Sequence, residues 1–389
     1  MTLKPDEQRV ARATLTYLAE PGDPALGALL NACEPAAILA GISGGRLPTA
    51  AAAGLGEPAR DGGVARFDRA MRRWRARLSE IPDGADPGAF KREGIRLVCP
   101  GDPEWPSQLD MLGDGRPYAL WLRGSADLRH GCLRSVSIVG ARAATAYGAH
   151  VCMEMAAALA ERGWAVVSGG AYGIDGCAHR GALAAEGMTV AVLACGVDHA
   201  YPRGHEELLD AVAAQGVVAS EWPPGRTPTR LRFLVRNRVI AALTRGTVVV
   251  EAGLRSGALS TARHARELHR PLMAVPGPVT SELSAGCHEI IREWGAVCVT
   301  GAGDVLDQVA IVGDHVSGRR RGPALSRDAL DPVTARVLDA LPARGGAGPA
   351  TIAVSAAVDL DTAMRCLGAL AAGGFAERCA RGWRLRRRP

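Results

Sequence analysis

Short apolar segments alternate with helical segments through the middle of this 389-residue chain, and no other feature restricts its fold as strongly. The segments between the apolar runs mostly show a helical pattern of roughly 10–15 residues. Near-continuous apolar strands joined by helices are typical of a parallel sheet covered by helices on both faces. The expected strands are Val136–Val139, Trp164–Val167, Thr189–Leu193, Val217–Ala219, Thr247–Val250, Leu272–Val275 and Ala296–Val299.

The two flanks of this region show other patterns. Short helical segments broken by proline and glycine run from Gln8 to Ala40, as in a small helical bundle. Ser317–Pro323 has the composition of a linker, and Asp331–Trp383 shows three helices and a hairpin, the outline of a winged helix. We therefore predict an α/β fold with a small helical domain at 1–85, a sheet domain at 86–312, a linker at 313–330 and a winged-helix domain with a basic tail at 331–389.

Composition excludes several classes of enzyme. Lys4 and Lys91 are the only lysines, so the chain has no Walker A loop, and no residue after position 91 has the amine that a Schiff base needs. The net charge of +6 is modest for this length, so any contact with nucleic acid is expected to be local.

The cysteines and the N-terminus indicate a cytoplasmic protein. Ten cysteines are scattered from Cys33 to Cys379 without a C-x-x-C pair, which favours reduced thiols over a metal site. The first residues lack the pattern of a signal peptide, and no apolar run reaches the ~18 residues of a membrane span. We expect no metal, no cofactor and no membrane association.

Three turns after expected strands are rich in glycine or small hydroxyl residues. They are Gly140–Arg142, Ser168–Asp175 and Glu251–Thr261. In an open parallel sheet such turns meet at the carboxyl edge of the strands, where ligands bind. At the first turn, backbone N–H groups and the dipole of the following helix favour an anion, to which Arg142 adds a planar fork of donors. None of the turns is a G-x-G-x-x-G fingerprint, so the pattern predicts a phosphate or nucleotide-chain site without NAD. Candidate residues are Gly140, Arg142, Ser168, Gly169 and Gly170.

A fourth candidate is the helix that opens at Arg230. Arg232 and Arg236 fall on one helical face, with Phe233 and Asn237 one step around it. An aromatic ring among guanidinium groups suits the stacking of a splayed base beside its phosphate. The alternative is that Phe233 belongs to the core and that the arginines pair with Glu221 or Glu251.

Asp175 and His179 lie four residues apart on the helix after the second turn. This spacing suits acid–base chemistry or metal binding. Two ligands do not make a metal site, however, and a capping or buried hydrogen-bonding role is the better prediction for Asp175.

The ordered motifs from about Pro106 to Val299 resemble those of the DNA-processing protein A (DprA, also called Smf) family. The shared segments are Ser137–Arg142 with Tyr147–Gly148, Ser168–Asp175 with Ala178–His179, Tyr201–Pro202, Ser220–Glu221, Phe233 with Arg236–Arg238, Val250–Ala252 with Ser256–Gly257, and Pro276–Gly277. Leu234 stands where the family usually has proline, and His288 where asparagine is common.

The resemblance implies a Rossmann-like domain that binds single-stranded DNA without hydrolysing it, forms a homodimer and helps to load RecA recombinase, as in natural transformation. It further implies that the helical N-terminal domain, of the SAM or helix-hairpin-helix kind, and the winged helix are family additions. By this resemblance the first-turn arginine is Arg142, the basic residue after Tyr-Pro is Arg203, and the basic residues before the family phenylalanine are Arg230 and Arg232.

Two other functions compete with this hypothesis. One is a nucleoside-monophosphate phosphoribohydrolase of the lysine-decarboxylase-like Rossmann group, which would use Glu251 as an acid or base. The chain lacks that group's Pro-Gly-Gly-x-Gly-Thr stretch. The other is double-strand reading by the winged helix, but Asp361–Leu370 holds only Arg365.

Overall fold

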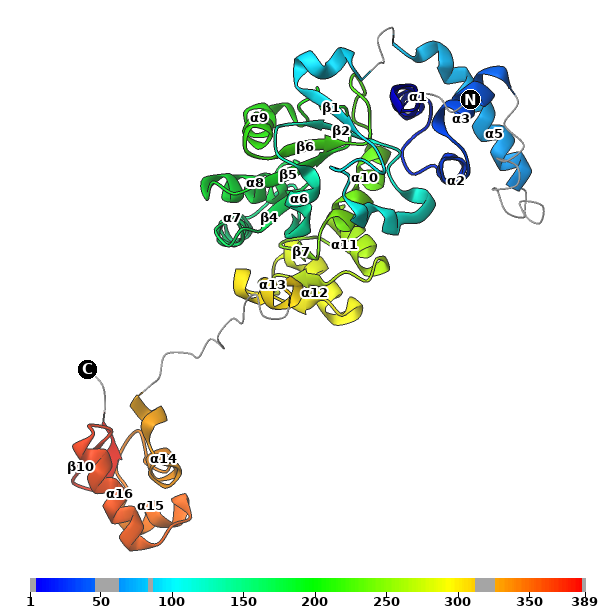
Figure 1. Cartoon of the computed structure of the whole chain (residues 1–389). Coiled ribbons are helices and arrows are strands. Elements are labelled where there is room, and N and C mark those ends of the chain that lie inside the picture. The colour runs from blue at the N-terminus through cyan, green and yellow to red at the C-terminus, as the bar shows by residue number, and fades with distance from the viewer. Residues whose placement is uncertain (1–4, 46–62, 83–86, 312–325, 387–389) are drawn as a thin grey trace. The chain divides into compact units, whose positions relative to one another are not determined.

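A nine-stranded mixed sheet forms the centre of the larger of two compact units in the computed structural model (Figure 1). The structure describes residues 5–45, 63–82, 87–311 and 326–386. The strand order is β1-β2-β6-β5-β4-β3-β7-β8-β9. Their bounds are β1 Ile95–Val98, β2 Leu120–Arg123, β3 Ser135–Val139, β4 Ala165–Ser168, β5 Thr189–Leu193, β6 Val217–Ser220, β7 Thr247–Val249, β8 Leu272–Ala274 and β9 Val297–Cys298.

The prediction of a parallel sheet is confirmed for every strand from β3 to β9. β2 pairs antiparallel with both β1 and β6, so this edge of the sheet is antiparallel. After β1 and β2 the chain enters the middle of the sheet at β3, runs outward through β4, β5 and β6, and then returns to β7 on the other side of β3. β3 and β7 therefore flank the point where the strand order reverses, and ligands of open α/β sheets bind at such a point.

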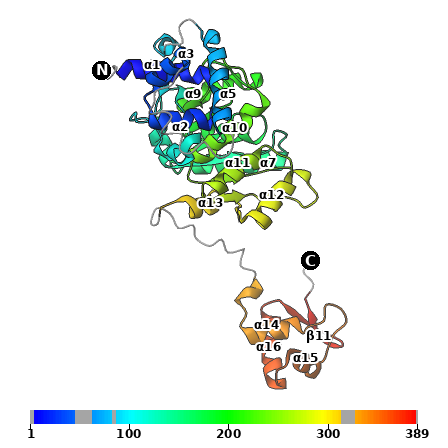
Figure 2. The ribbon, with the colours of Figure 1, turned by 90° about the vertical axis from the view of Figure 1, so that its right-hand side faces the viewer.

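Helices cover both faces of the sheet, as Figures 1 and 2 show. Neighbouring residues of one strand point to opposite faces, so Ile138 packs against α7 and α8 while Val139 packs against α10 and α11. The helices of this region are α6 Leu128–Leu133, α7 Ala146–Ala160, α8 Ile174–Ala184, α9 Glu206–Gln215, α10 Arg230–Leu243, α11 Ala258–Glu267, α12 Glu282–Trp294 and α13 Ala302–Val309.

The N-terminal helices have a hydrophobic core of their own, built around Leu15, Leu29, Ile42 and Trp74. Their bounds are α1 Pro5–Leu18, α2 Pro24–Ala32, α3 Pro35–Gly44 and α5 Gly63–Ala76. These helices and the sheet form one compact unit, residues 1–317. The predicted boundary at 85 stays a prediction.

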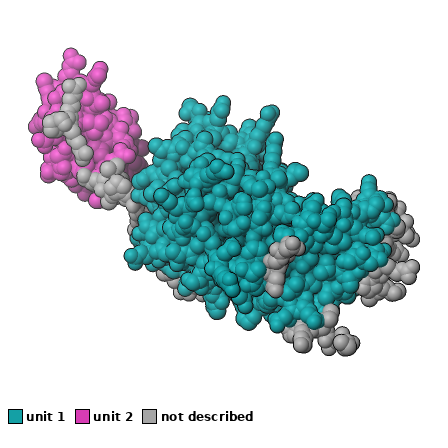
Figure 3. Space-filling model, turned by 90° about the horizontal axis from the view of Figure 1, so that it is seen from above, with its two compact units in different colours: residues 1–317 teal, residues 318–389 magenta. Residues whose placement is uncertain are grey.

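Residues 318–389 form the second compact unit (Figure 3). It contains α14 Pro332–Asp339, α15 Pro349–Ala356, α16 Leu360–Ala372 and the antiparallel strands β10 Ala376–Cys379 and β11 Gly382–Leu385. Val337, Ile352, Leu367 and Leu370 form its core. The order of elements is the predicted one, and the assignment as a winged helix stays a prediction. Most of the predicted linker, 313–325, lies outside the described residues.

Candidate nucleic-acid interface

An open cavity of about 800 Å³ lies where β3 and β7 end. All three glycine-rich turns contribute to its wall, so the prediction that they meet at one sheet edge is confirmed. The start of α10 also lines the cavity, with Arg230, Phe233 and Leu234. Four arginines and one aspartate line the cavity, which gives it a formal charge of +3. They are Arg142, Arg230, Arg236, Arg255 and Asp175.

Gly140 allows the first turn to pass close to its neighbours. A Cβ atom at this position would lie 2.6 Å from Cγ1 of Ile174 and 2.9 Å from the carbonyl oxygen of Glu251. The turn then leads to Thr145, whose hydroxyl accepts a hydrogen bond from the Gly148 N–H (3.1 Å) and caps α7. Gly140 therefore shapes the cavity wall through its lack of a side chain.

Glu251 occupies the start of α7. Its carboxylate accepts hydrogen bonds from the Thr145 N–H (2.9 Å) and hydroxyl (2.6 Å). The anion at this helix N-terminus is thus a side chain of the protein itself, which corrects the expectation that a phosphate binds the helix dipole there. Glu251 is 3% exposed and does not line the cavity, so its geometry does not favour the phosphoribohydrolase alternative.

Arg142 is exposed and lies over the ring of Phe233, with 4.9 Å between Cζ and the ring centroid. The ring of Tyr201 also contacts Phe233, with 5.5 Å between ring centroids and 49° between the ring planes. All three side chains line the cavity. Phe233 is partly exposed, so the alternative that it belongs to the core is not favoured. An aromatic ring with a guanidinium group on it offers a base a stacking surface and its phosphate a partner.

Arg236 is buried beneath this surface and ties α10 to the second turn. Its guanidinium donates to the carbonyl oxygens of Gly169 (2.8 Å) and Val192, and to Oδ1 of Asn237 (3.2 Å). Asn237 in turn donates to the Gly257 carbonyl (3.2 Å). Burial lowers the pKa of Arg236 to about 10, with Asp175 as a compensating charge, so Arg236 stays protonated at neutral pH. The pair therefore positions the walls of the cavity.

The second turn supports the site from below. Ser168, Gly169 and Gly170 are buried and do not line the cavity. The Ser168 hydroxyl donates to the Ile138 carbonyl (2.6 Å), and a Cβ atom on Gly169 would lie 2.5 Å from Nη1 of Arg236. Gly170 has a φ of 69°, which favours glycine. Their predicted contact with DNA stays a prediction. In the structure these residues contact β3 and Arg236, beneath the wall of the cavity.

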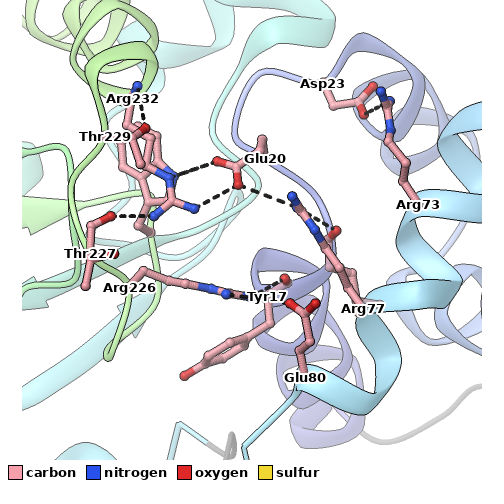
Figure 4. Close-up of polar contacts among 12 residues, drawn as sticks. Tyr17, Glu20, Asp23, Arg73, Arg77, Glu80, Arg226, Thr227, Thr229 and Arg232 are labelled. Atoms are coloured by element: carbon pink, nitrogen blue, oxygen red, sulfur yellow. Dashed lines mark hydrogen bonds and ion pairs between the residues drawn. The ribbon is translucent and has the colours of Figure 1, made fainter.

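Arg232 points away from the cavity toward α1 (Figure 4). Its Nη2 and Nε atoms pair with the carboxylate of Glu20 at 2.8 and 3.1 Å, and Nη1 donates to the Thr227 carbonyl (2.6 Å). Burial by itself raises the pKa of Glu20, but hydrogen bonds from Arg232 and Trp222 outweigh it and the pKa is lowered.

Arg232 and Arg236 therefore do not face one ligand together. Arg232 pairs with Glu20, whereas Arg236 donates to backbone carbonyl oxygens. The open alternative of an ion pair holds for Arg232, with Glu20 in place of the expected Glu221 or Glu251. Glu221 pairs with Arg238. Sequence reasoning could not find Glu20 because it lies more than 200 residues before Arg232 and in another predicted domain.

Arg230 and Arg203 are exposed, but only Arg230 lines the cavity. The structure adds Arg255, an exposed residue of the third turn that was not among the predicted site residues. The sequence could have identified Arg255, because this arginine lies within the third glycine-rich turn, Glu251–Thr261. The two residues that depart from the family pattern differ in position. Leu234 lines the cavity, whereas His288 does not, and its Nε2 lies 3.0 Å from the Gly277 carbonyl oxygen.

Asp175 and His179 serve the fold. Asp175 is 7% exposed, and its Oδ2 accepts from the Ala171 N–H (3.4 Å). His179 is fully buried, and its Nδ1 lies 2.8 Å from the hydroxyl of Thr189. That hydroxyl donates to the Val166 carbonyl, so Nδ1 is the donor toward it. Among the described residues, no group of three or more His, Cys, Asp or Glu side chains could hold a metal ion.

Burial of His179 makes stability depend on pH. Desolvation lowers the pKa of His179 to about 3, from 6.5. Below pH 6.5 the unfolded chain binds a proton that the folded chain does not. The free energy of unfolding therefore decreases by about 1.4 kcal/mol for each unit by which the pH is lowered. We expect His179 to account for a loss of about 2 kcal/mol between about pH 7 and about pH 5. Urea unfolding of wild type and His179→Leu at both pH values measures it. An equal loss in the variant would contradict this assignment.

A comparison with protein families matches residues 96–310, more than half of the chain, to the family described as DNA recombination-mediator protein A. This chain belongs to the DprA family. A DprA homologue of Mycobacterium tuberculosis (strain H37Rv) is 48% identical over 307 residues, which cover 76% of this chain and 78% of the relative. The DNA processing protein DprA of Streptococcus pneumoniae is 40% identical over 205 residues, covering 53% of this chain and 71% of the relative.

Solved DprA structures share the fold. The X-ray structure of the Streptococcus pneumoniae protein has a TM-score of 0.60 at 30% identity and covers 80% of this chain and 100% of that one. The DprA structure from Helicobacter pylori has a TM-score of 0.50 at 28% identity and covers 55% of this chain and 94% of that one. The latter is described as showing a single-stranded DNA binding mode. The family expected from the sequence motifs and the α/β fold with its parallel sheet are thereby confirmed.

The structure offers little support for reading of double-stranded DNA by the predicted winged helix. α16 would be the reading helix of a winged helix, and Arg365 in it donates to the hydroxyl of Thr362 (3.0 Å). No other basic residue lies on this helix.

In the described part of the chain, no helix is long and apolar enough to cross a membrane.

Proposed function

We propose that this chain binds single-stranded DNA in the cavity at the end of β3 and β7 and is not an enzyme. The observation that carries the proposal is the exposed guanidinium of Arg142 on the partly exposed ring of Phe233. Arg230 and Arg255 line the same cavity without an ion-pair partner among the described residues. Stacking on an aromatic ring accepts any base, and exposed arginines bind phosphates of any sequence, so binding is expected to be sequence-tolerant.

Binding should depend on salt and on Arg142. Each phosphate neutralised on a single strand contributes roughly −0.7 to the slope of log K against log salt. We expect Arg142→Ala to make the slope of fluorescent oligo-dT binding shallower by about 0.7 and to weaken binding at low salt. Arg129→Ala is the control, because Arg129 is exposed on α6, which leads into the opposite end of β3. Salt-independent binding by the wild type, or the same slope in Arg142→Ala, would refute the proposal.

We further propose that the bound strand is protected and passed to RecA recombinase, in DNA processing during transformation or recombination. Membership of the DprA family supports this role. Crosslinking of the full chain with RecA, with and without single-stranded DNA, tests it directly. Absence of a crosslink under both conditions would remove RecA as a partner.

A homodimer is also proposed. The strand β9 ends the sheet, and its residues Val297 and Cys298 are both exposed. An exposed edge strand offers unpaired N–H and C=O groups to a second chain. Sedimentation equilibrium of the full chain distinguishes a dimer from a monomer.

A further inference from the structure

Tyr172 is an exposed aromatic residue that the proposed function does not use. Its side chain is 50% exposed in a chain in which aromatic residues make up 4% of the sequence. The ring packs edge-on against His205, with 4.8 Å between ring centroids and 73° between the ring planes. Tyr172 is therefore held in place while half of its surface stays open to solvent.

His205 is a rigid support for this ring. It is 3% exposed, and its Nδ1 lies 3.0 Å from the Gly170 carbonyl oxygen, which can only accept, so Nδ1–H donates. A Cβ atom on Gly204 would lie 2.7 Å from the Tyr172 hydroxyl, and one on Gly176 would lie 2.7 Å from Cε1 of His205. Two glycines thus let the pair of rings press against the backbone, which fixes the ring of Tyr172 before any ligand arrives.

Two arginines stand beside these rings. Nη1 of Arg180 lies 3.0 Å from the position that a Cβ on Gly176 would take, next to the ring of His205. Arg203 begins the short helix that contains His205. Both arginines are exposed, and in the described ranges neither takes part in an ion pair or a side-chain hydrogen bond. Glu206 and Glu207 start α9 nearby and form no ion pair with them.

Tyr172 and Arg203 stand close in the chain to residues that line the cavity. Ala171 lines the cavity and directly precedes Tyr172. Tyr201 also lines it, contacts Phe233, and precedes Arg203 by two residues. The segment from Tyr201 to Gly204 thus leads from Phe233 to the ring of Tyr172, since a Cβ atom on Gly204 would lie 2.7 Å from the Tyr172 hydroxyl.

We propose that Tyr172, braced by His205, stacks a second base of the bound single strand, with Arg180 and Arg203 on the neighbouring phosphates. The ligand is a polynucleotide, because a second stacking surface outside the cavity has no use for a mononucleotide. This inference rests on the proposed function and extends the binding site by a segment of the strand. Exposed aromatics that alternate with cations are the usual construction of such a path.

The test is a series of oligo-dT lengths from about 4 to about 20 nucleotides, which spans the site sizes of single-strand binding proteins. Tyr172→Leu removes the stacking face but keeps an apolar side chain, and Tyr172→Phe keeps the face. We expect Tyr172→Leu to weaken binding of the long oligonucleotides by about 5- to 150-fold, with no change for the shortest that bind and wild-type behaviour in Tyr172→Phe. The salt slope should stay unchanged in Tyr172→Leu and become shallower by about 0.7 in Arg180→Ala.

The outcomes separate the inference from the function on which it rests. If Tyr172→Leu binds long oligonucleotides as the wild type does, or weakens all lengths equally, the second stacking site is refuted. If the wild type binds no oligonucleotide of any length, the proposed function itself fails. Thermal unfolding of each variant shows that it is folded.

Discussion

Phe233→Ala is expected to weaken binding of long oligo-dT by about 5- to 150-fold. Stacking of one base on an aromatic ring contributes about 1–3 kcal/mol, and Phe233 is the aromatic side chain on which Arg142 rests. Loss of the ring also removes the surface that orients this guanidinium, so the effect should lie in the upper part of the range. Fluorescence anisotropy at fixed salt measures the affinity.

The matched control for this substitution is Leu231→Ala on the same helix. Leu231 is 73% exposed and does not line the cavity, so its loss should leave the affinity unchanged. Phe233→Trp retains an aromatic face and should retain most of the binding. Equal affinities for Phe233→Ala and wild type would show that the bases stack elsewhere.

Arg238→Met is expected to lower the free energy of unfolding by about 3–5 kcal/mol, because it leaves the carboxylate of Glu221 buried without its partner. The two side chains are joined by two hydrogen bonds of 2.6 and 2.7 Å, and Glu221 is 2% exposed. Urea unfolding followed by tryptophan fluorescence measures the change, since Trp222 is buried next to Glu221.

The double variant Glu221→Leu with Arg238→Met isolates the cause. Replacing a buried ion pair by apolar side chains of similar volume is often neutral, so the double variant should recover most of the stability. If the double variant is as unstable as Arg238→Met alone, lost packing rather than an unpaired charge explains the effect. If the single variant is as stable as the wild type, the pair does not stabilise the fold.

The periodicity of the sequence was sufficient to predict the sheet, the covering helices and the edge where the three turns meet. These features depend on local patterns: strands such as Leu272–Ala274 are apolar throughout because both of their faces are buried. The antiparallel pairing of β2 was not predictable in this way, because a strand's partner is chosen by contacts between segments far apart in the chain.

The arginines show where local reasoning ends. Arg142, Arg230, Arg232 and Arg236 are equivalent by composition, and helix spacing placed Arg232 and Arg236 on one face. In the folded chain Arg142 lies on Phe233, Arg232 is bound by Glu20 and Arg236 donates to backbone carbonyls. Such partners come from elements distant in sequence, so spacing along one helix cannot reveal them.

The sequence by itself determined the parallel α/β sheet, the glycine-rich edge and the presence of an aromatic side chain among arginines, since each follows from side-chain type and period. Only the tertiary structure decided which of those side chains are free to meet a ligand. The physical reason is that a charge inside the protein must be paired, and the nearest partner in space is not the nearest in sequence. Glu251 accepts hydrogen bonds at the start of α7, and Glu20 pairs with Arg232. Arg142 stays exposed on the ring of Phe233.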